Sequence, residues 1–326
     1  MNFQQIQIHA GLPKAGSSSI QQALHQHRDL LAIHDIHYAQ PEGTQSSKNH
    51  NQLFLNFAKT GILFPSIFSP KSGRLIFSSE AISTQFGHYE LKALVNHLQT
   101  ELPHEELQFI LYVRHPLELL RSTFQHYLKW GEIKIQELAE APPIPKIRKL
   151  ITKFQRLSKG SRLTVRQLEL PVTETKSHEK DFLALAGLPE KVLASLKTES
   201  VRNSLSHEST LALELVKMYD YQKRIDRAML IPKLNSSGAK FYLPEAFLKR
   251  YSNVLLQDAS WLAQEYKIHY DLSGPFSISN PTKLTQEDIT DQVVDILNEY
   301  YPQQNITRSQ IQSDFRKIDK WLATLC

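Results

Sequence analysis

The segment from Leu107 to Val113 is the feature that most limits how this chain can fold. It reads LQFILYV, an apolar run interrupted only by Gln108 and bounded by charged sequence on both sides. A strand without regular polar alternation is buried on both faces, which is typical of parallel sheets covered by helices. Shorter candidate strands around residues 6–8, at 74–78 and at 162–166 join it. The chain is therefore predicted to contain a parallel sheet.

Candidate helices alternate with these strands, and the second half of the chain is mostly helical. Helical patterns cover residues 17–27, 52–59, 90–98, 117–130, 146–157, 181–186, 208–221, 244–266, 286–300 and 308–324. This alternation predicts an α/β fold, a P-loop-type parallel sheet flanked by helices with a mostly helical C-terminal half. We expect one domain over residues 1–275 and, over 276–326, a helical C-terminal extension packed on the same domain.

Ligands of open parallel sheets bind beyond the carboxyl ends of the strands. The residues that follow Ile8, Phe77 and Val113 are therefore the first candidates for ligand-binding or catalytic residues. After Ile8 the sequence reads HAGLPKAGSSS and runs into a predicted helix. Glycines allow a tight turn, and the N–H groups at a helix start attract anions, to which serine hydroxyls and the charge of Lys14 add. The alternative is a polar turn before a helix, without a ligand.

The spacing of Gly11 and Gly16 is similar to that of the nucleotide-triphosphatase loop G-x-x-x-x-G-K-[ST]. Here Ser17 follows the second glycine, where that loop has lysine, and Lys14 lies two positions before it. This difference disfavours an ordinary ATPase or kinase. After the strongest strand comes Tyr112-Val113-Arg114-His115-Pro116, with Ser122 eight residues beyond Arg114. An arginine at such a strand end is suited to bidentate contact with phosphate.

Together these two motifs resemble those of sulfotransferases that use 3′-phosphoadenosine 5′-phosphosulfate (PAPS). The resemblance implies that a 5′-phosphosulfate-binding loop is formed by Lys14, Ala15, Gly16, Ser17 and Ser18. It also implies that Arg114 and Ser122 hold the 3′-phosphate, and that Lys14 acts in catalysis. The likeness extends approximately over residues 5–272 and includes Arg166-Gln167-Leu168-Glu169 followed by Asp181. A glycine-rich cofactor segment of the cytosolic branch is absent, which favours the bacterial and carbohydrate-type branches.

Glu80 is the candidate general base. It follows the predicted strand at residues 74–78, and carbohydrate sulfotransferases, which this stretch resembles, commonly have a glutamate there. The alternative is a carboxylate placed at a helix N-terminus because the helix dipole favours it. His88 is a weaker rival for the same role. The resemblance implies transfer to a hydroxyl or amine, with a carbohydrate as the acceptor. Other functions to test are a P-loop kinase and a non-catalytic module that binds an anionic glycan.

Composition sets further limits. The formal net charge is +5, which suits an anionic partner, but no run of five like charges occurs, so we expect no nucleic-acid partner. The only cysteine is Cys326, and no cluster has the spacing of metal ligands, so we expect no metal. No apolar stretch is long enough to cross a bilayer, and no signal peptide is visible. We therefore expect a cytoplasmic protein.

Overall fold

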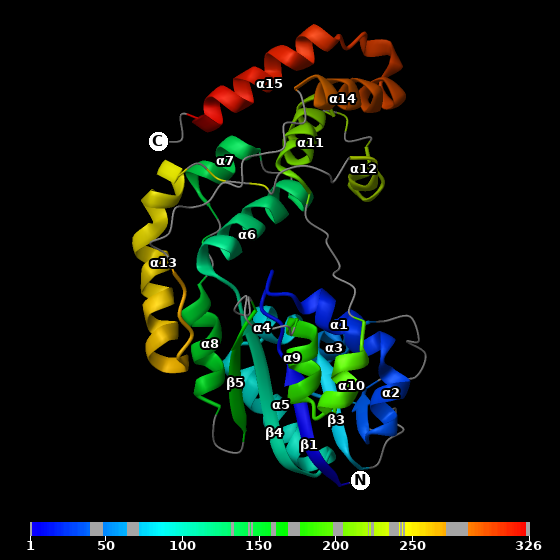
Figure 1. Cartoon of the computed structure of the whole chain (residues 1–326), viewed down its shortest axis with the longest axis vertical. Helices are drawn as coiled ribbons and strands as arrows, with labels where there is room; N and C mark the ends of the chain where they lie inside the picture. Colours follow the sequence, from blue (N-terminus) through cyan, green and yellow to red (C-terminus); the bar gives the residue numbers. More distant parts are fainter. Residues whose placement is uncertain are drawn as a thin grey trace. The chain divides into compact units, whose positions relative to one another are not determined.

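The chain forms two compact units, each assembled from three segments. The computed structural model (Figure 1) describes residues 2–39, 48–63, 72–131, 134–142, 144, 146–157, 161–168, 177–197, 205–220, 222, 225–234, 241, 243, 245–271 and 286–323. The first unit is made from Met1–His115, Lys146–Val201 and Asp258–His269. The second is made from Pro116–Pro145, Arg202–Gln257 and Tyr270–Cys326.

A five-stranded, all-parallel sheet forms the centre of the first unit, in the order β2-β3-β1-β4-β5. The strands are β1 Phe3–His9, β2 Ile36–Tyr38, β3 Arg74–Ser78, β4 His104–Val113 and β5 Arg162–Gln167. In the middle of the sheet, Ile8 lies beside Phe77 on one neighbour and Phe109 on the other. The central strands are buried, as the apolar run of β4 predicts. The sheet confirms the predicted parallel α/β fold.

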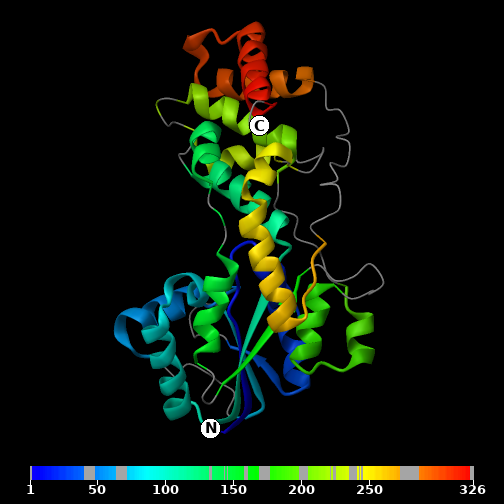
Figure 2. The ribbon, with the colours of Figure 1, turned by 90° about the vertical axis from the view of Figure 1, so that its left-hand side faces the viewer.

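Helices cover both faces of this sheet (Figure 2). They are α1 Ser17–Gln26, α2 Arg28–Ile33, α3 Asn51–Thr60, α4 Ala81–Gln85, α5 His88–Glu101, α8 Ile147–Gln155, α9 His178–Leu185 and α10 Glu190–Ser195. On one face Phe77 packs against Phe54 of α3, with ring centroids 5.7 Å apart, and Phe109 packs against Phe154 of α8 at 5.5 Å. The patterns at 17–27, 52–59, 90–98, 146–157 and 181–186 are confirmed as helices.

The opposite face carries a row of amides, which join the strands to one another and to α9. Gln7 Nε2 donates to Gln108 Oε1 at 3.0 Å and to the Leu185 carbonyl at 2.9 Å, at the end of α9. Gln108 Nε2 in turn donates to Thr164 Oγ1 at 2.8 Å, which links β4 to β5. The two amide NH₂ groups thus find acceptors on neighbouring strands and on the helix above, whereas Gln7 Oε1 is buried and has no hydrogen-bond partner in the described structure.

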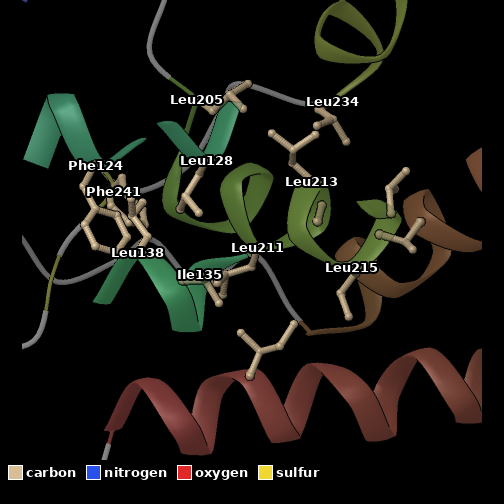
Figure 3. Close-up of a cluster of buried hydrophobic side chains, with 14 of the residues drawn as sticks. Phe124, Leu128, Ile135, Leu138, Leu205, Leu211, Leu213, Leu215, Leu234 and Phe241 are labelled. Atoms are coloured by element: carbon tan, nitrogen blue, oxygen red, sulfur yellow. The ribbon is translucent and has the colours of Figure 1, made fainter. Parts of the chain in front are cut away.

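The second unit is helical, as predicted for the C-terminal half. Its helices are α6 Pro116–Trp130, α7 Ile135–Glu140, α11 His207–Tyr219, α12 Arg227–Lys233, α14 Gln286–Tyr300 and α15 Arg308–Ala323, with the 3₁₀ turn η2 Pro302–Gln304. The long helix α13, Glu245–Tyr266, contributes residues to both units. Leucines of α11 form the centre of its core, together with Phe124 of α6 and Phe241 (Figure 3). Helices α14 and α15, from the predicted extension, pack against α11.

No helix among the described residues combines the length and the apolar character that a membrane crossing requires. Among the described residues, seven short elements were not predicted from the sequence: β2, α2, α4, α7, α10, α12 and η2. Each has seven residues or fewer, which is too short for a hydrophobic period to show. One of them, α4, proves to matter for the candidate site.

Candidate functional site

The candidate residues meet because of the order of the strands. Strand β1 lies between β3 and β4, and the chain reaches β2 and β3 on one side of β1 before crossing to β4 on the other. Such a reversal is the topological switch point at which open α/β sheets bind ligands. Three candidate segments follow the carboxyl ends of these neighbouring strands: the loop after β1, Glu80 after β3 and Arg114 after β4.

The loop between β1 and α1 has two residues in the left-handed conformation. Lys14 has a φ of 61°, and Gly16, which precedes the first residue of α1, has a φ of 76°. The N–H of Ala15 donates to the Leu12 carbonyl at 3.2 Å and closes the turn. Gly16 occupies the N-cap position of α1, where no side-chain capping hydrogen bond is made. The first N–H groups of a helix have no partner within the helix. These groups suit an anion.

Both glycines of the loop are required by close contacts. A Cβ atom added to Gly11 would lie 2.3 Å from Ser17 Oγ and 3.1 Å from Glu80 Cγ. One added to Gly16 would lie 2.5 Å from Leu168 Cδ1, at the end of β5. Because Gly11 has no side chain, Glu80 and Ser17 can approach each other next to its backbone. In the same way, Gly16 lets the start of α1 lie against the end of β5.

Glu80 turns its side chain toward this loop. Burial raises the pKa of its carboxyl group above the ordinary 4.5, while a hydrogen bond from Ser17 and the positive charge of Lys14 oppose the rise. Glu80 occupies the position before α4, but its side chain makes no capping hydrogen bond to that helix. The contacts therefore favour a carboxylate that belongs to the loop over one held only by a helix dipole.

Arg114 reaches the same loop from the other side. It follows the last residue of β4, and its Nη1 donates to the backbone carbonyl of Lys14 at 3.4 Å. Both side chains are only half-buried, so each has a part open to solvent. One cation within the loop and another from the end of β4 thus lie at the same place, which suits a multiply charged anion.

The remaining predicted residues differ in exposure. Ala15 and Ser17 are buried, and Ser18 is exposed on the first turn of α1. Ser122 is half-buried on α6 and belongs to the second unit, so its contact with a 3′-phosphate stays a prediction. His88 is exposed at the first residue of α5, and no interaction in the described structure links it to the loop.

The arginine-and-acid segment forms an ion pair beside the loop. Arg166, on β5, donates through Nε to Asp181 Oδ2 at 3.0 Å, and the Tyr112 hydroxyl donates to the same oxygen at 2.7 Å. Residue Glu169 of that segment lies outside the described residues. Asp181 is on α9, so this group joins the ends of β4 and β5 to the helix above them. A buried carboxylate paired in this way stabilises the local structure without needing a ligand.

Comparison of the chain with protein-family models, with curated proteins and with solved structures gave no match. The motifs and their geometry are therefore the basis for any functional conclusion. Among the residues that the structure describes, no group of three or more histidine, cysteine or acidic side chains is arranged to hold a metal ion. The prediction that no metal takes part stays a prediction.

Three residues that support the site were not predicted. His50 accepts a hydrogen bond through Nδ1 from the Ser78 N–H at 3.1 Å and donates through Nε2 to the Ala39 carbonyl. Asn51, at the start of α3, and Lys153, on α8, bind the two ends of α4. In the sequence, Lys153 looks like one more exposed cation on a basic helix, and Asn51 like an ordinary polar residue at a helix start. No sequence signal separates these residues from solvated ones.

Proposed function

We propose that this protein is a transferase that moves the sulfuryl group of 3′-phosphoadenosine 5′-phosphosulfate to a hydroxyl or amine of an acceptor. The observation that carries the proposal is the meeting of Lys14, Glu80 and Arg114 around one loop. A carboxylate and two cations from three strand ends supply an acid–base group and an anion site at the same place. The motifs that resemble sulfotransferases contain these three residues.

In the proposed complex the loop holds the 5′ end of the donor. The N–H groups at the start of α1 and the hydroxyl groups of Ser17 and Ser18 donate to the 5′-phosphate, and Lys14 adds a full positive charge. Arg114, from the next strand, binds the 3′-phosphate together with Ser122. Ala15 and Gly16 contribute backbone alone, and a Cβ atom at Gly16 would have to displace the side chains of Leu168 and His178.

The proposed reaction is an in-line displacement at sulfur. The acceptor oxygen or nitrogen forms a bond to sulfur while the bond from sulfur to the bridging oxygen of the 5′-phosphate breaks. Glu80 takes the acceptor proton, and the electron pair of the broken bond leaves with adenosine 3′,5′-bisphosphate. Lys14 stabilises the charge that grows on the bridging oxygen. For Glu80 a raised pKa is useful, because a stronger base accepts a proton more readily once it is ionised.

A carbohydrate is the acceptor class that the Glu80 motif implies. An equivalent stretch in carbohydrate sulfotransferases has its glutamate at the same point after a strand, and the net charge of +5 suits an acidic glycan. The cytoplasmic location expected from the sequence fits a donor nucleotide that is made inside cells.

Two measurements test the proposal. Isothermal titration calorimetry should show binding of adenosine 3′,5′-bisphosphate that is tighter than binding of ATP with magnesium. Incubation with ³⁵S-labelled donor and a panel of glycans, phenols, lipids and amines should label at least one acceptor class. Preference for ATP with magnesium would instead support a kinase. Binding of an anionic glycan without any effect of the nucleotide would support a non-catalytic module.

A further inference from the structure

Helix α4 begins directly after Glu80, and the backbone at this point is bound by a side chain from another helix. Asn51 Oδ1, on α3, accepts hydrogen bonds from the Glu80 N–H at 2.9 Å and from the Ala81 N–H at 3.3 Å. The same oxygen accepts from Ser79 Oγ at 2.8 Å. Backbone N–H groups only donate, so their common partner must be the amide oxygen and not the amide nitrogen.

The residue before a helix commonly caps it with its own side chain, which accepts from the second or third N–H group of the helix. The Glu80 side chain makes no such bond and lies against Gly11 and Ser17 instead. Asn51 binds the backbone N–H of Glu80 itself and shares that of Ala81 with Ser79 Oγ, which accepts it at 3.2 Å. Asn51 therefore fixes the stretch of backbone that carries the acid–base group.

The other end of α4 is fixed as well. Lys153 Nζ donates to the Phe86 carbonyl at 2.8 Å and to the Ser83 and Ile82 carbonyls. In the middle of the helix, Ser83 Oγ donates to the carbonyl of Gly11, in the loop itself. Helix α4 is thus joined to the loop and to two other helices, although it has only five residues.

We propose that Asn51 is the positioning residue that holds Glu80 against the loop. Because Asn51 is a neutral amide, it does so without placing a charge beside the Glu80 carboxyl group. The structural part of this inference stands on the contacts of Asn51. Its catalytic consequence rests on the proposed function, in which Glu80 accepts the acceptor proton. In the described part of the chain, Asn51 Nδ2 makes no hydrogen bond, so exchanging that group for an oxygen breaks none of the observed contacts.

The substitution Asn51→Asp uses this property. It keeps the accepting oxygen but adds a negative charge beside Glu80, which should raise the pKa of the Glu80 carboxyl by about one unit. The matched control is Asn56→Asp, which adds the same charge on the same helix at an exposed position. Asn51→Ala removes the acceptor, so the amide of Glu80 should exchange with solvent roughly three to ten times faster, whereas the amide of Ala81 keeps Ser79 Oγ as an acceptor.

The experiment is a ¹³C NMR titration of the glutamate carboxyl groups in the full chain, with the Glu80 signal assigned by its loss in Glu80→Gln. A raised Glu80 pKa in Asn51→Asp but not in Asn56→Asp, with faster exchange in Asn51→Ala, supports the inference. An unchanged Glu80 pKa in Asn51→Asp overturns it, and this variant serves even if Asn51→Ala fails to fold.

The titration needs no substrate, so it separates this inference from the proposed function. If the Glu80 pKa shifts as expected but no acceptor is labelled, Asn51 positions Glu80 and the transferase proposal fails. If transfer occurs, the acid limb of its pH profile should move upward in Asn51→Asp by the shift seen in the titration. A pH profile that stays in place overturns the positioning role, because a merely structural residue would change the rate without moving the limb.

Discussion

Arg114 donates a hydrogen bond to the backbone carbonyl of Lys14, across a sequence separation of 100 residues. The contact joins the ends of two neighbouring strands, β1 and β4. It also means that Arg114 supports the loop directly, besides any contact that it makes with a ligand.

Replacing Arg114 by alanine should weaken binding of adenosine 3′,5′-bisphosphate by about 1.5–3 kcal/mol, the contribution of a hydrogen bond to a charged group. Calorimetry measures this loss. The control is Arg162→Ala, which removes an exposed cation at the first residue of β5, the strand next to β4. If both variants bind the nucleotide as tightly as the parent protein, Arg114 does not hold a phosphate.

Gly16→Ala should abolish nucleotide binding, and Gly61→Ala should leave it unchanged. Both glycines have a left-handed backbone, with φ of 76° and 71°, so the conformational cost of about 1–2 kcal/mol is shared. Only at Gly16 would the new methyl group meet neighbours, the side chains of Leu168 and His178, whereas Gly61 has open space. Thermal unfolding and calorimetry on the pair isolate the effect of this contact. Equal behaviour of the two variants would show that the tight approach at Gly16 is not needed.

Glu80→Gln should lose transfer activity while still binding the bisphosphate nucleotide. A base must be ionised, and burial raises the pKa of Glu80 above 4.5, so activity should rise with pH through a value above 4.5. The dependence of kcat/KM on pH shows this limb in the parent protein. A variant that keeps normal turnover, or a parent profile whose acid limb lies at or below 4.5, would exclude Glu80 as the base.

Acid should destabilise the first unit through His50. Burial lowers the pKa of His50 to about 4 from 6.5, so this histidine stays neutral in the folded state. The unfolded chain binds a proton below pH 6.5 that the folded chain binds only near pH 4. The contribution of the neutral His50 to the free energy of unfolding is therefore complete above pH 6.5. It falls by about 1.4 kcal/mol per pH unit toward pH 4.

Urea unfolding at pH 7, 6 and 5 measures this dependence. His50→Gln should flatten it by one proton, because the glutamine does not titrate. His88→Gln, which removes an exposed imidazole, is the control. His9, whose pKa burial lowers to about 3, contributes in the same direction and remains in both variants. A slope that is the same in His50→Gln as in the parent would contradict the assignment of the neutral state to His50.

The strands that form the site were predictable, and the residues that hold them in place were not. Strand β1 alternates isoleucine with glutamine, strands β3 and β4 contain apolar runs, and polar residues follow all three, so the sequence predicts that the loop, Glu80 and Arg114 lie at the same end of the sheet. Asn51 and Lys153 act through single hydrogen-bonding atoms on helices of ordinary amphipathic pattern. Such contacts depend on tertiary packing, which leaves no periodic trace in the sequence.

The row of amides under α9 has a consequence for the register in which the strands of the sheet pair. Strand β1 would have to slide by two residues, about 6.6 Å, to keep its apolar side chains on the same face. That shift would take Gln7 Nε2 away from both Gln108 and the Leu185 carbonyl, and a buried donor without a partner costs about 1–3 kcal/mol. The glutamines thus penalise misaligned intermediates that hydrophobic residues alone would tolerate.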